Sequence, residues 1–318
     1  MNLQDKKVLV TGGAGFIGST LVRRLLKERA DVIVLDNFRS GSLNNLKEVE
    51  KQITIINGTI LDKNLDKIFK DNKVDFVFNL AALPYIPDSY KIPHEFFEVN
   101  SLGTLNVVMS AVKTGVKRVL QYSSSEVYGT AKQLPMNEDH PTLPHSTYAV
   151  SKLAADRVCF TLFHEKKAPV VILRQFNTYG PRETHPYIIP IAMSQLSKSS
   201  KINLGNIKAR RDFVYVEDSA DAAVRLIKHN GIDGQVFNCG SSKDCSIEFL
   251  VNKIGEIMGH KRIYIKVEKS RLRPLDVQVL GADYSKLNKV TGWNPKINIE
   301  EGLKMTYQWF IDNGRKWT

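Results

Sequence analysis

The chain has 318 residues, of which 42% are hydrophobic and 25% are charged, values that are ordinary for a folded protein and argue against disorder. Its formal net charge of +12 at pH 7 would suit an acidic partner. No zinc-finger spacing, aromatic RNA-binding string or long basic run accompanies this charge, so we expect a lysine-rich surface and no nucleic-acid partner.

Short runs rich in β-branched residues alternate with longer amphipathic segments through the first half of the chain. The predicted strands are residues 7–11, 32–36, 53–57, 75–80, 119–123 and 170–173. The predicted helices between them are residues 19–29, 100–112 and 148–165. This alternation predicts an α/β fold of the Rossmann type, with a doubly wound parallel sheet covered by helices on both faces.

The alternation ends after Arg174, where loops rich in Gly and Pro precede a helix-like segment at residues 191–197. No Pro- or Ser-rich linker separates the two parts. We therefore predict a smaller C-terminal lobe that packs directly against the first and leaves a cleft between them. The predicted first domain comprises residues 1–176 and about 213–237, and the predicted substrate-binding lobe comprises residues 177–212 and 238–318.

Residues 11–18 read Thr-Gly-Gly-Ala-Gly-Phe-Ile-Gly and connect the first predicted strand to the first predicted helix. Gly12, Gly15 and Gly18 permit a tight turn and let bare backbone approach a pyrophosphate at the positive end of the helix. A plain tight turn is the alternative. Asp36, at the end of the next strand, favours a dinucleotide because its carboxylate would accept hydrogen bonds from the adenosine ribose. The same charge would repel a 2′-phosphate, so the predicted cofactor is NAD.

Tyr148 and Lys152 are spaced i, i+4 on a predicted helix, so their side chains share one face. Such a pair by itself is most often a surface feature. Residues 123–129, Ser-Ser-Ser-Glu-Val-Tyr-Gly, follow a central strand at the sheet edge where doubly wound folds bind ligands, and we expect the two segments to converge there. The Lys152 ammonium and a positively charged nicotinamide would lower the pKa of the Tyr148 phenol, which could then act as a base while Ser124 shares the proton.

These motifs, together with residues 79–82, 174–177 and 211–213, resemble the extended short-chain dehydrogenase/reductase family. That family includes nucleotide-sugar epimerases, dehydratases and decarboxylases. The resemblance extends over about residues 7–310. It implies an NAD-dependent enzyme that binds a nucleotide sugar and forms a homodimer through the second and third predicted helices.

The resemblance also implies a set of site residues. The catalytic residues would be Ser124, Ser125, Glu126, Tyr148 and Lys152. The cofactor-binding residues would be Gly12, Gly15, Phe16, Ile17, Gly18, Asp36, Asn37, Thr59, Ile60, Leu80, Ala81, Ala82 and Asn100, together with Tyr148 and Lys152. The substrate-binding residues would be Tyr90, Asn177, Arg182, Arg211, Arg273 and Asp276. The chain departs from the family pattern at Gln175, where Pro is usual, and at Thr59, where Asp is common.

Glu126 is the residue that bears most on the reaction. Enzymes of this family are similar in oxidising the sugar C4 hydroxyl first, and a 4,6-dehydratase then needs a base for the C5 proton while the C6 hydroxyl departs. Ser125 and Glu126 resemble the Ser-Glu pair of GDP-mannose-type dehydratases, and the loops at residues 81–90 and 176–182 resemble dehydratases that act on N-acetylglucosamine nucleotides. We therefore predict a 4,6-dehydratase that acts on a UDP-linked hexose such as UDP-N-acetylglucosamine.

Other interpretations remain open. A UDP-sugar C4-epimerase needs no further carboxylate, and UDP-glucuronate decarboxylases also resemble the chain at Ser125 and Glu126. Glu126 could instead cap a backbone amide or pair with a lysine. A regulator that binds NAD without turnover is the hypothesis from another class, and the presence of Ser124, Tyr148 and Lys152 argues against it.

The cysteines and histidines suggest neither disulfides nor a metal. Cys159, Cys239 and Cys245 are widely spaced and odd in number, which favours buried thiols in a reducing compartment. The seven histidines are scattered, so we expect no metal site. The sequence has no signal-peptide pattern and no run approaching ~20 apolar residues. We expect a cytoplasmic protein without a membrane partner.

Overall fold

Seven parallel strands form the main sheet, in the order β10-β6-β5-β4-β1-β2-β3. The computed structural model describes residues 1–317. The strands of this sheet are β1 (Lys7–Thr11), β2 (Asp31–Asp36), β3 (Thr54–Asn57), β4 (Phe76–Asn79), β5 (Arg118–Ser124), β6 (Val170–Gln175) and β10 (Val236–Cys239). The predicted doubly wound parallel sheet is confirmed, and the ends of the predicted strands differ from the observed ends by at most two residues.

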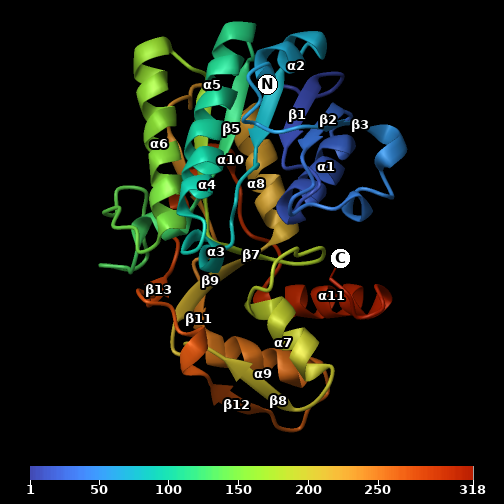
Figure 1. Cartoon of the computed structure of the whole chain (residues 1–318), viewed down its shortest axis with the longest axis vertical. Coiled ribbons are helices and arrows are strands. Elements are labelled where there is room, and N and C mark those ends of the chain that lie inside the picture. Colours follow the sequence, from blue (N-terminus) through green and yellow to red (C-terminus); the bar gives the residue numbers. More distant parts are fainter. Residues whose placement is uncertain (318) are drawn as a thin grey trace.

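Helices cover both faces of this sheet (Figure 1). One face packs against α1 (Phe16–Lys27), α8 (Val216–Lys228) and α10 (Ser285–Thr291). The other face packs against α2 (Leu65–Asp71), α5 (Gly103–Thr114) and α6 (Thr147–Lys166). Two layers of buried aliphatic and aromatic side chains result, because strands covered on both faces are apolar on both faces.

Shorter elements connect the strands of the first lobe. They are η1 (Leu43–Asn45), η2 (Glu50–Gln52), α3 (Ile86–Ser89), α4 (Pro93–Phe97), the π-helix η3 (Glu98–Leu102) and η4 (Ser125–Tyr128). Among residues 1–317, no helix has the length and apolarity needed to cross a membrane.

The second lobe is built on β9 (Arg210–Tyr215), which pairs with three other strands. These are β7 (Asn177–Tyr179), β11 (Asp244–Ser246) and β13 (Val279–Leu280). The rest of the lobe consists of α7 (Ile188–Leu196), β8 (Lys201–Leu204), α9 (Ile247–Ile257), β12 (Tyr264–Val267), η5 (Lys269–Arg271) and α11 (Ile299–Asp312). Figure 1 shows this lobe below the carboxyl ends of the main sheet. A third apolar core fills it, and Phe16 and Ile17 of α1 pack against that core.

The main sheet changes direction at β1, which pairs with β2 on one side and with β4 on the other. The chain segments that leave the carboxyl ends of β1 and β4 therefore diverge and leave a crevice, the usual ligand site of an open α/β sheet. The second lobe closes this crevice from below.

Asp212 of β9 ties the loops of the second lobe together. Its side chain is fully buried and accepts hydrogen bonds from the backbone N–H groups of Ser241 (2.6 Å), Ser242 (2.8 Å) and Ala282 (3.0 Å). Three backbone donors thus share one buried carboxylate. Because β9 carries Arg211 next to Asp212, this arrangement also fixes the position of a cavity residue.

Asp212→Asn should destabilise the protein strongly, because an amide offers one acceptor oxygen and brings N–H groups against buried donors. We expect the free energy of unfolding to fall by about 3 kcal/mol, as measured by urea denaturation. Asp244→Asn is the control, since Asp244 forms an ion pair with Arg210 whose guanidinium is half exposed, and should cost under about 1 kcal/mol. Equal losses in the two variants would contradict the role given to Asp212.

Candidate active site

A cavity of about 840 Å³ occupies the crevice between the two lobes. Its wall runs from Asp36 at the end of β2, past the turn at residues 12–18, to Tyr148 on α6. The second lobe contributes Arg211 and Arg273 to the far side. The segments predicted to converge from the sequence are therefore brought to one space.

The glycine turn packs so closely that side chains would not fit. Gly12 has a φ of +69°, and a Cβ there would lie 2.9 Å from the backbone nitrogen of Ala81. A Cβ on Gly18 would collide with the carbonyl oxygen of Gly12. No side chain caps α1 and no acidic residue lies in its first turn, so its N–H groups stay available to an anion. This arrangement fits the pyrophosphate of a dinucleotide.

Asp36 supports the same turn from β2. Its Oδ2 accepts a hydrogen bond from Ala14 N at 2.9 Å, and its Oδ1 accepts one from Phe38 N at 2.8 Å. Burial raises the pKa of this carboxyl, and the backbone hydrogen bonds partly offset that effect. Each oxygen keeps a second lone pair for a ribose hydroxyl. The residues present therefore fit NAD at both the adenosine end and the phosphates.

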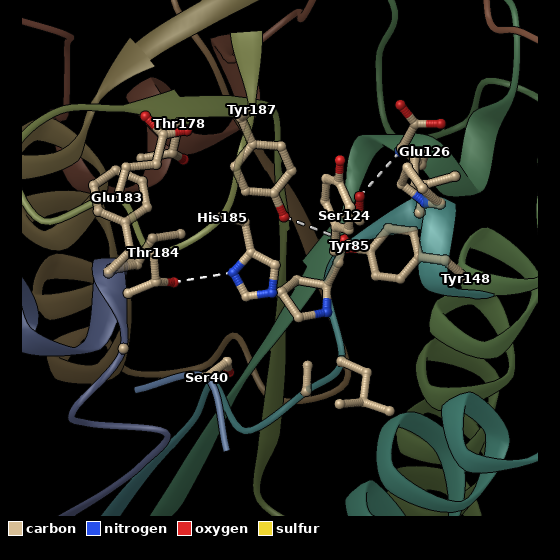
Figure 2. A pocket seen from close by; sticks show the side chains of 18 of the residues that line it. Ser40, Tyr85, Ser124, Glu126, Tyr148, Thr178, Glu183, Thr184, His185 and Tyr187 are labelled. Carbon is tan, nitrogen blue, oxygen red and sulfur yellow. Dashed lines mark hydrogen bonds between the residues drawn. The ribbon is translucent and has the colours of Figure 1, made fainter. Parts of the chain in front are cut away.

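Tyr148 and Ser124 lie close together at the other end of the cavity (Figure 2). Burial raises the pKa of the Tyr148 phenol to about 12, although a hydrogen bond with Ser124 lowers it. The lowered pKa expected from the sequence is therefore not produced by the protein alone. The physical reason is that burial disfavours the phenolate more than the single hydroxyl stabilises it.

Lys152 points from the same helix face into the site, as its spacing predicts. Its Nζ donates a hydrogen bond to the carbonyl oxygen of Tyr122 at 2.6 Å. Burial lowers the pKa of this amine to about 8, and the nearby Asp156 carboxylate opposes the shift. The pKa of Lys152 therefore lies near neutral pH, and a backbone carbonyl of β5 holds its amine in place.

Glu126 lies on η4 next to Ser124, whose Oγ accepts a hydrogen bond from Glu126 N at 3.2 Å. Glu126 lines the cavity, and the residue as a whole is 9% exposed. Among residues 1–317 it forms no ion pair within 4 Å, and it acts on the pKa of Arg211, which it raises against the lowering effect of burial. Ser125 beside it is 2% exposed and also lines the cavity.

Arg211 and Arg273 converge on one carboxylate. Oδ1 of Asp276 lies 3.6 Å from Nη2 of Arg211 and 3.8 Å from Nη1 of Arg273. Oδ2 of Asp276 accepts a hydrogen bond from Asn206 Nδ2 at 2.9 Å. Asp276 thus orients two guanidinium groups toward the cavity, an arrangement that suits a diphosphate. Tyr90 lines the wall nearby.

Most of the other predicted residues also line the cavity. These are Gly15, Phe16, Ile17, Asn37, Thr59, Ile60, Leu80, Ala81, Ala82 and Asn177. Thr59 reaches the wall although Asp is common there in the family. Gln175 is held by Ser219, whose Oγ donates to its Oε1 at 2.7 Å, and its own amide donates to the carbonyl oxygen of Cys239 at 3.3 Å.

Two predicted site residues are not brought to the cavity wall. Asn100 uses its side-chain amide to bind the backbone of Leu83 and the hydroxyl of Ser151, so it positions the loop after β4. Arg182 lies 3.5 Å from the Glu48 carboxylate at the side of α1. Among residues 1–317, no group of three or more His, Cys, Asp or Glu side chains is arranged to hold a metal.

The sequence reasoning missed a cluster in the loop between β7 and α7. Glu183, Thr184, His185 and Tyr187 line the cavity, and the rings of Tyr85, His185 and Tyr187 pack against one another with centroids 5.6 to 5.8 Å apart (Figure 2). Burial raises the pKa of Tyr187 and lowers that of His185. The available signal was a polar and aromatic run directly after a short strand, in a region already assigned to loops.

Comparison with known proteins gives one consistent result. The family model described as GDP-mannose 4,6 dehydratase matches residues 9–306. A dTDP-D-glucose 4,6-dehydratase of Mus musculus is 31% identical, over 98% of this chain and 90% of its own. A UDP-N-acetyl-alpha-D-glucosaminuronate decarboxylase of Bacillus cytotoxicus is 33% identical, over 96% and 98%.

Solved structures agree. A UDP-N-acetylglucosamine 4-epimerase from Methanobrevibacter ruminantium, in complex with UDP-N-acetylmuramic acid, superposes with a TM-score of 0.88 at 33% identity, over 98% of this chain and 99% of that one. A dTDP-glucose 4,6-dehydratase from Bacillus anthracis, in complex with NAD, has a TM-score of 0.89 at 29% identity, over 98% of both chains. These comparisons confirm the predicted cofactor, NAD.

Lys152→Met should change how stability depends on pH. The folded protein releases the Lys152 proton near pH 8, whereas the unfolded chain holds it to about 10.5, so between these values the unfolded state binds more protons. The free energy of unfolding of the wild type should then rise with pH, by on the order of 3 kcal/mol relative to the variant. Urea denaturation from about pH 8 to about pH 10 measures this gain.

The matched control is Lys166→Met, at the exposed end of the same helix, which should follow the wild type across this range. A constant difference between wild type and Lys152→Met at every pH would show that Lys152 is not neutralised by burial.

Proposed function

Since the chain belongs to the extended short-chain dehydrogenase/reductase family of NAD-dependent nucleotide-sugar dehydratases, epimerases and decarboxylases, we propose that it is a nucleotide-sugar 4,6-dehydratase. The observation that carries the proposal is the carboxyl group of Glu126, which faces the cavity beside Ser124 and Tyr148 without an ion-pair partner within 4 Å among the described residues. A carboxylate left free in a buried site is available to move a proton.

The first step is the oxidation of the sugar C4 hydroxyl. NAD supplies the chemistry of this step by accepting the hydride from C4 and later giving it back. Tyr148 takes the hydroxyl proton, and Ser124, which is hydrogen-bonded to it, shares that proton. Since burial opposes the phenolate, Tyr148 needs positive charge close by, and Lys152 one helical turn further on is the side chain placed to supply it.

The second step is the loss of water across C5 and C6. The ketone at C4 acidifies the C5 proton, which passes to the Glu126 carboxylate while the C6 hydroxyl departs as water. The same carboxyl group, once protonated, can supply the proton that the departing hydroxyl needs. Ser125 carries no acid of its own, so this assignment uses Glu126 for both transfers. Return of the hydride to C6 and of a proton to C5 completes a 4-keto-6-deoxy sugar.

The competing reactions use the same first step. A C4-epimerase returns the hydride to the opposite face of C4 and has no use for a carboxylate at Glu126. A decarboxylase loses carbon dioxide from C5, and the Bacillus cytotoxicus relative makes this the second candidate. The carboxylate of Glu126 favours the dehydratase over the epimerase, and the products separate the dehydratase from the decarboxylase.

The proposed substrate is a UDP-linked hexose such as UDP-N-acetylglucosamine. Arg211 and Arg273, held together by Asp276, supply the two cations that its diphosphate needs. We further propose a homodimer through α5 and α6, where Val150 is exposed on the surface.

Mass spectrometry of the products tests the reaction directly. The purified protein with NAD is incubated with a panel of UDP-, GDP-, dTDP- and CDP-linked hexoses and hexuronates. We expect loss of one water from a hexose nucleotide. An isomer of unchanged mass with inverted C4, or loss of carbon dioxide from a hexuronate, would overturn the dehydratase assignment.

Glu126→Gln should separate the two chemical steps. C4 oxidation should still occur, visible as transient NADH absorbance, while formation of the 4-keto-6-deoxy product should slow by about 10²–10⁴-fold because the C5 base is lost. Glu248→Gln, on an exposed position of α9, is the control and should leave both steps unchanged. Loss of C4 oxidation with elimination intact would show that Glu126 has a different role.

A further inference from the structure

Glu183 is a buried carboxyl group that the proposed reaction does not use. It is 3% exposed, and its Oε2 has no hydrogen-bond partner among residues 1–317. Burial raises the pKa of this carboxyl well above its usual value. A buried polar atom without a partner is costly, so one is expected to be supplied from outside the chain. Because Glu183 lines the cavity, a ligand bound there can supply that partner.

The loop that carries Glu183 lies against the phosphate-binding end of α1. It joins β7 to α7, and the apolar core that includes Tyr179 and Ile189 from these two elements packs against Phe16 and Ile17. Those two residues form the first turn of α1, directly after the glycine turn. Glu183 thus lies in the loop between β7 and α7, and both of these elements pack near the N-terminus of α1, where the backbone N–H groups are free.

Arg182, the residue before Glu183, connects the same loop to the side of α1 through Glu48. Arg182 lies 3.5 Å from Glu48, and Glu48 also accepts a hydrogen bond from Arg23 of α1 at 3.1 Å. The Arg182 guanidinium is therefore engaged outside the cavity and does not neutralise Glu183.

Glu183 is separated from Ser124 and Tyr148 within the cavity. Figure 2 shows it beside Thr178 and Thr184, with Tyr187 and His185 toward the side of Ser124 and Tyr148. The pKa of the Tyr187 phenol is raised by both Tyr148 and Glu183, which places Tyr187 near each of them. Glu183 therefore lies across His185 and Tyr187 from the end of the cavity that holds Ser124 and Tyr148.

We propose that Glu183 is a cofactor-binding residue whose neutral carboxyl donates a hydrogen bond to a phosphate oxygen of the dinucleotide. An ionised carboxylate would repel the phosphate. A protonated carboxyl instead carries an O–H group on Oε2, which can donate a hydrogen bond to a phosphate oxygen. The bound phosphate favours the protonated form further, because two negative charges would otherwise lie together. The role applies to NAD binding whichever sugar reaction follows.

Arg182, His185 and Tyr187 place no free positive charge beside Glu183 that would favour the ionised carboxylate. In its own loop, Arg182 is paired with Glu48, and the pKa of His185 is lowered by burial, so that its ring is neutral. Tyr187, directly before α7, has a raised pKa and stays a neutral phenol. β7 contributes Thr178, which does not titrate.

Glu183→Leu and Glu183→Gln test the proposal by binding rather than by turnover. The dissociation constants for NAD and for ADP-ribose, which keeps the pyrophosphate but lacks nicotinamide, are measured by titration calorimetry. Leucine should weaken both ligands equally, by about 10- to 100-fold, because it removes the donor. Glutamine keeps an N–H donor and should stay within about 3-fold of the wild type. Glu248→Gln, at an exposed position of α9 away from the cavity, is the control and should bind both ligands like the wild type.

Two results would overturn the proposal. Wild-type binding by Glu183→Leu would mean that the carboxyl contacts no part of the dinucleotide. Weaker NAD but unchanged ADP-ribose would place the contact on nicotinamide and not on phosphate. Both outcomes leave the product test of the dehydratase untouched, so the two proposals can fail separately.

A pH series provides a second measurement that does not depend on how well the leucine variant folds. Below its raised pKa the carboxyl is protonated and binds, so wild-type affinity for ADP-ribose should fall as the pH rises through that value. Glu183→Gln should lack this loss. Parallel curves for the two proteins would contradict the protonated donor.

Discussion

The close backbone packing at the glycine turn is the constraint on which the rest of the site depends. Gly12 approaches the backbone of Ala81 after β4, and Gly18 approaches the carbonyl of Gly12, so strand, loop and helix meet without side chains between them. The N-terminus of α1 is thereby fixed toward the cavity with its N–H groups free. Its first turn then packs against the second lobe through Phe16 and Ile17. The turn thus sets both the cofactor site and the spacing of the two lobes.

Burial decides the charge states at the opposite end of the cavity. It raises the pKa of Tyr148 and lowers that of Lys152, so in the protein alone a neutral phenol faces an amine that readily loses its proton. Lys152, with a pKa of about 8, still carries positive charge at neutral pH, but burial outweighs any help it gives to the phenolate of Tyr148. The positive charge of oxidised nicotinamide acts in the same low-dielectric space, where its effect on a phenol is larger than in water. Binding of the cofactor and activation of the base are therefore coupled.

The sequence predicts what is encoded locally. The sheet follows from alternating patterns, the turn from glycine spacing, and the shared face of Tyr148 and Lys152 from helical periodicity. Roles that depend on tertiary contacts were missed or misplaced. Asn100 holds a loop instead of facing the cavity, and Glu183 reaches it only because β7 and α7 pack on α1. Burial of Tyr148, which raises the pKa of its phenol in the protein alone, also cannot be read from residue spacing.

The chain is about equally identical in sequence to a dehydratase and to a decarboxylase, because most of its residues serve parts of the fold that these enzymes have in common. Most of the chain builds the sheet, the turn and the support of Tyr148, and all of these serve the oxidation of C4, which the reactions share. What happens next is decided at C5 and C6 by the few groups that face them. Glu126 is a carboxyl on the cavity wall beside Ser124, with no ion-pair partner within 4 Å in the described chain. A buried carboxyl without a close ion-pair partner is costly, and this cost is the reason that the proposed function gives Glu126 a proton to move.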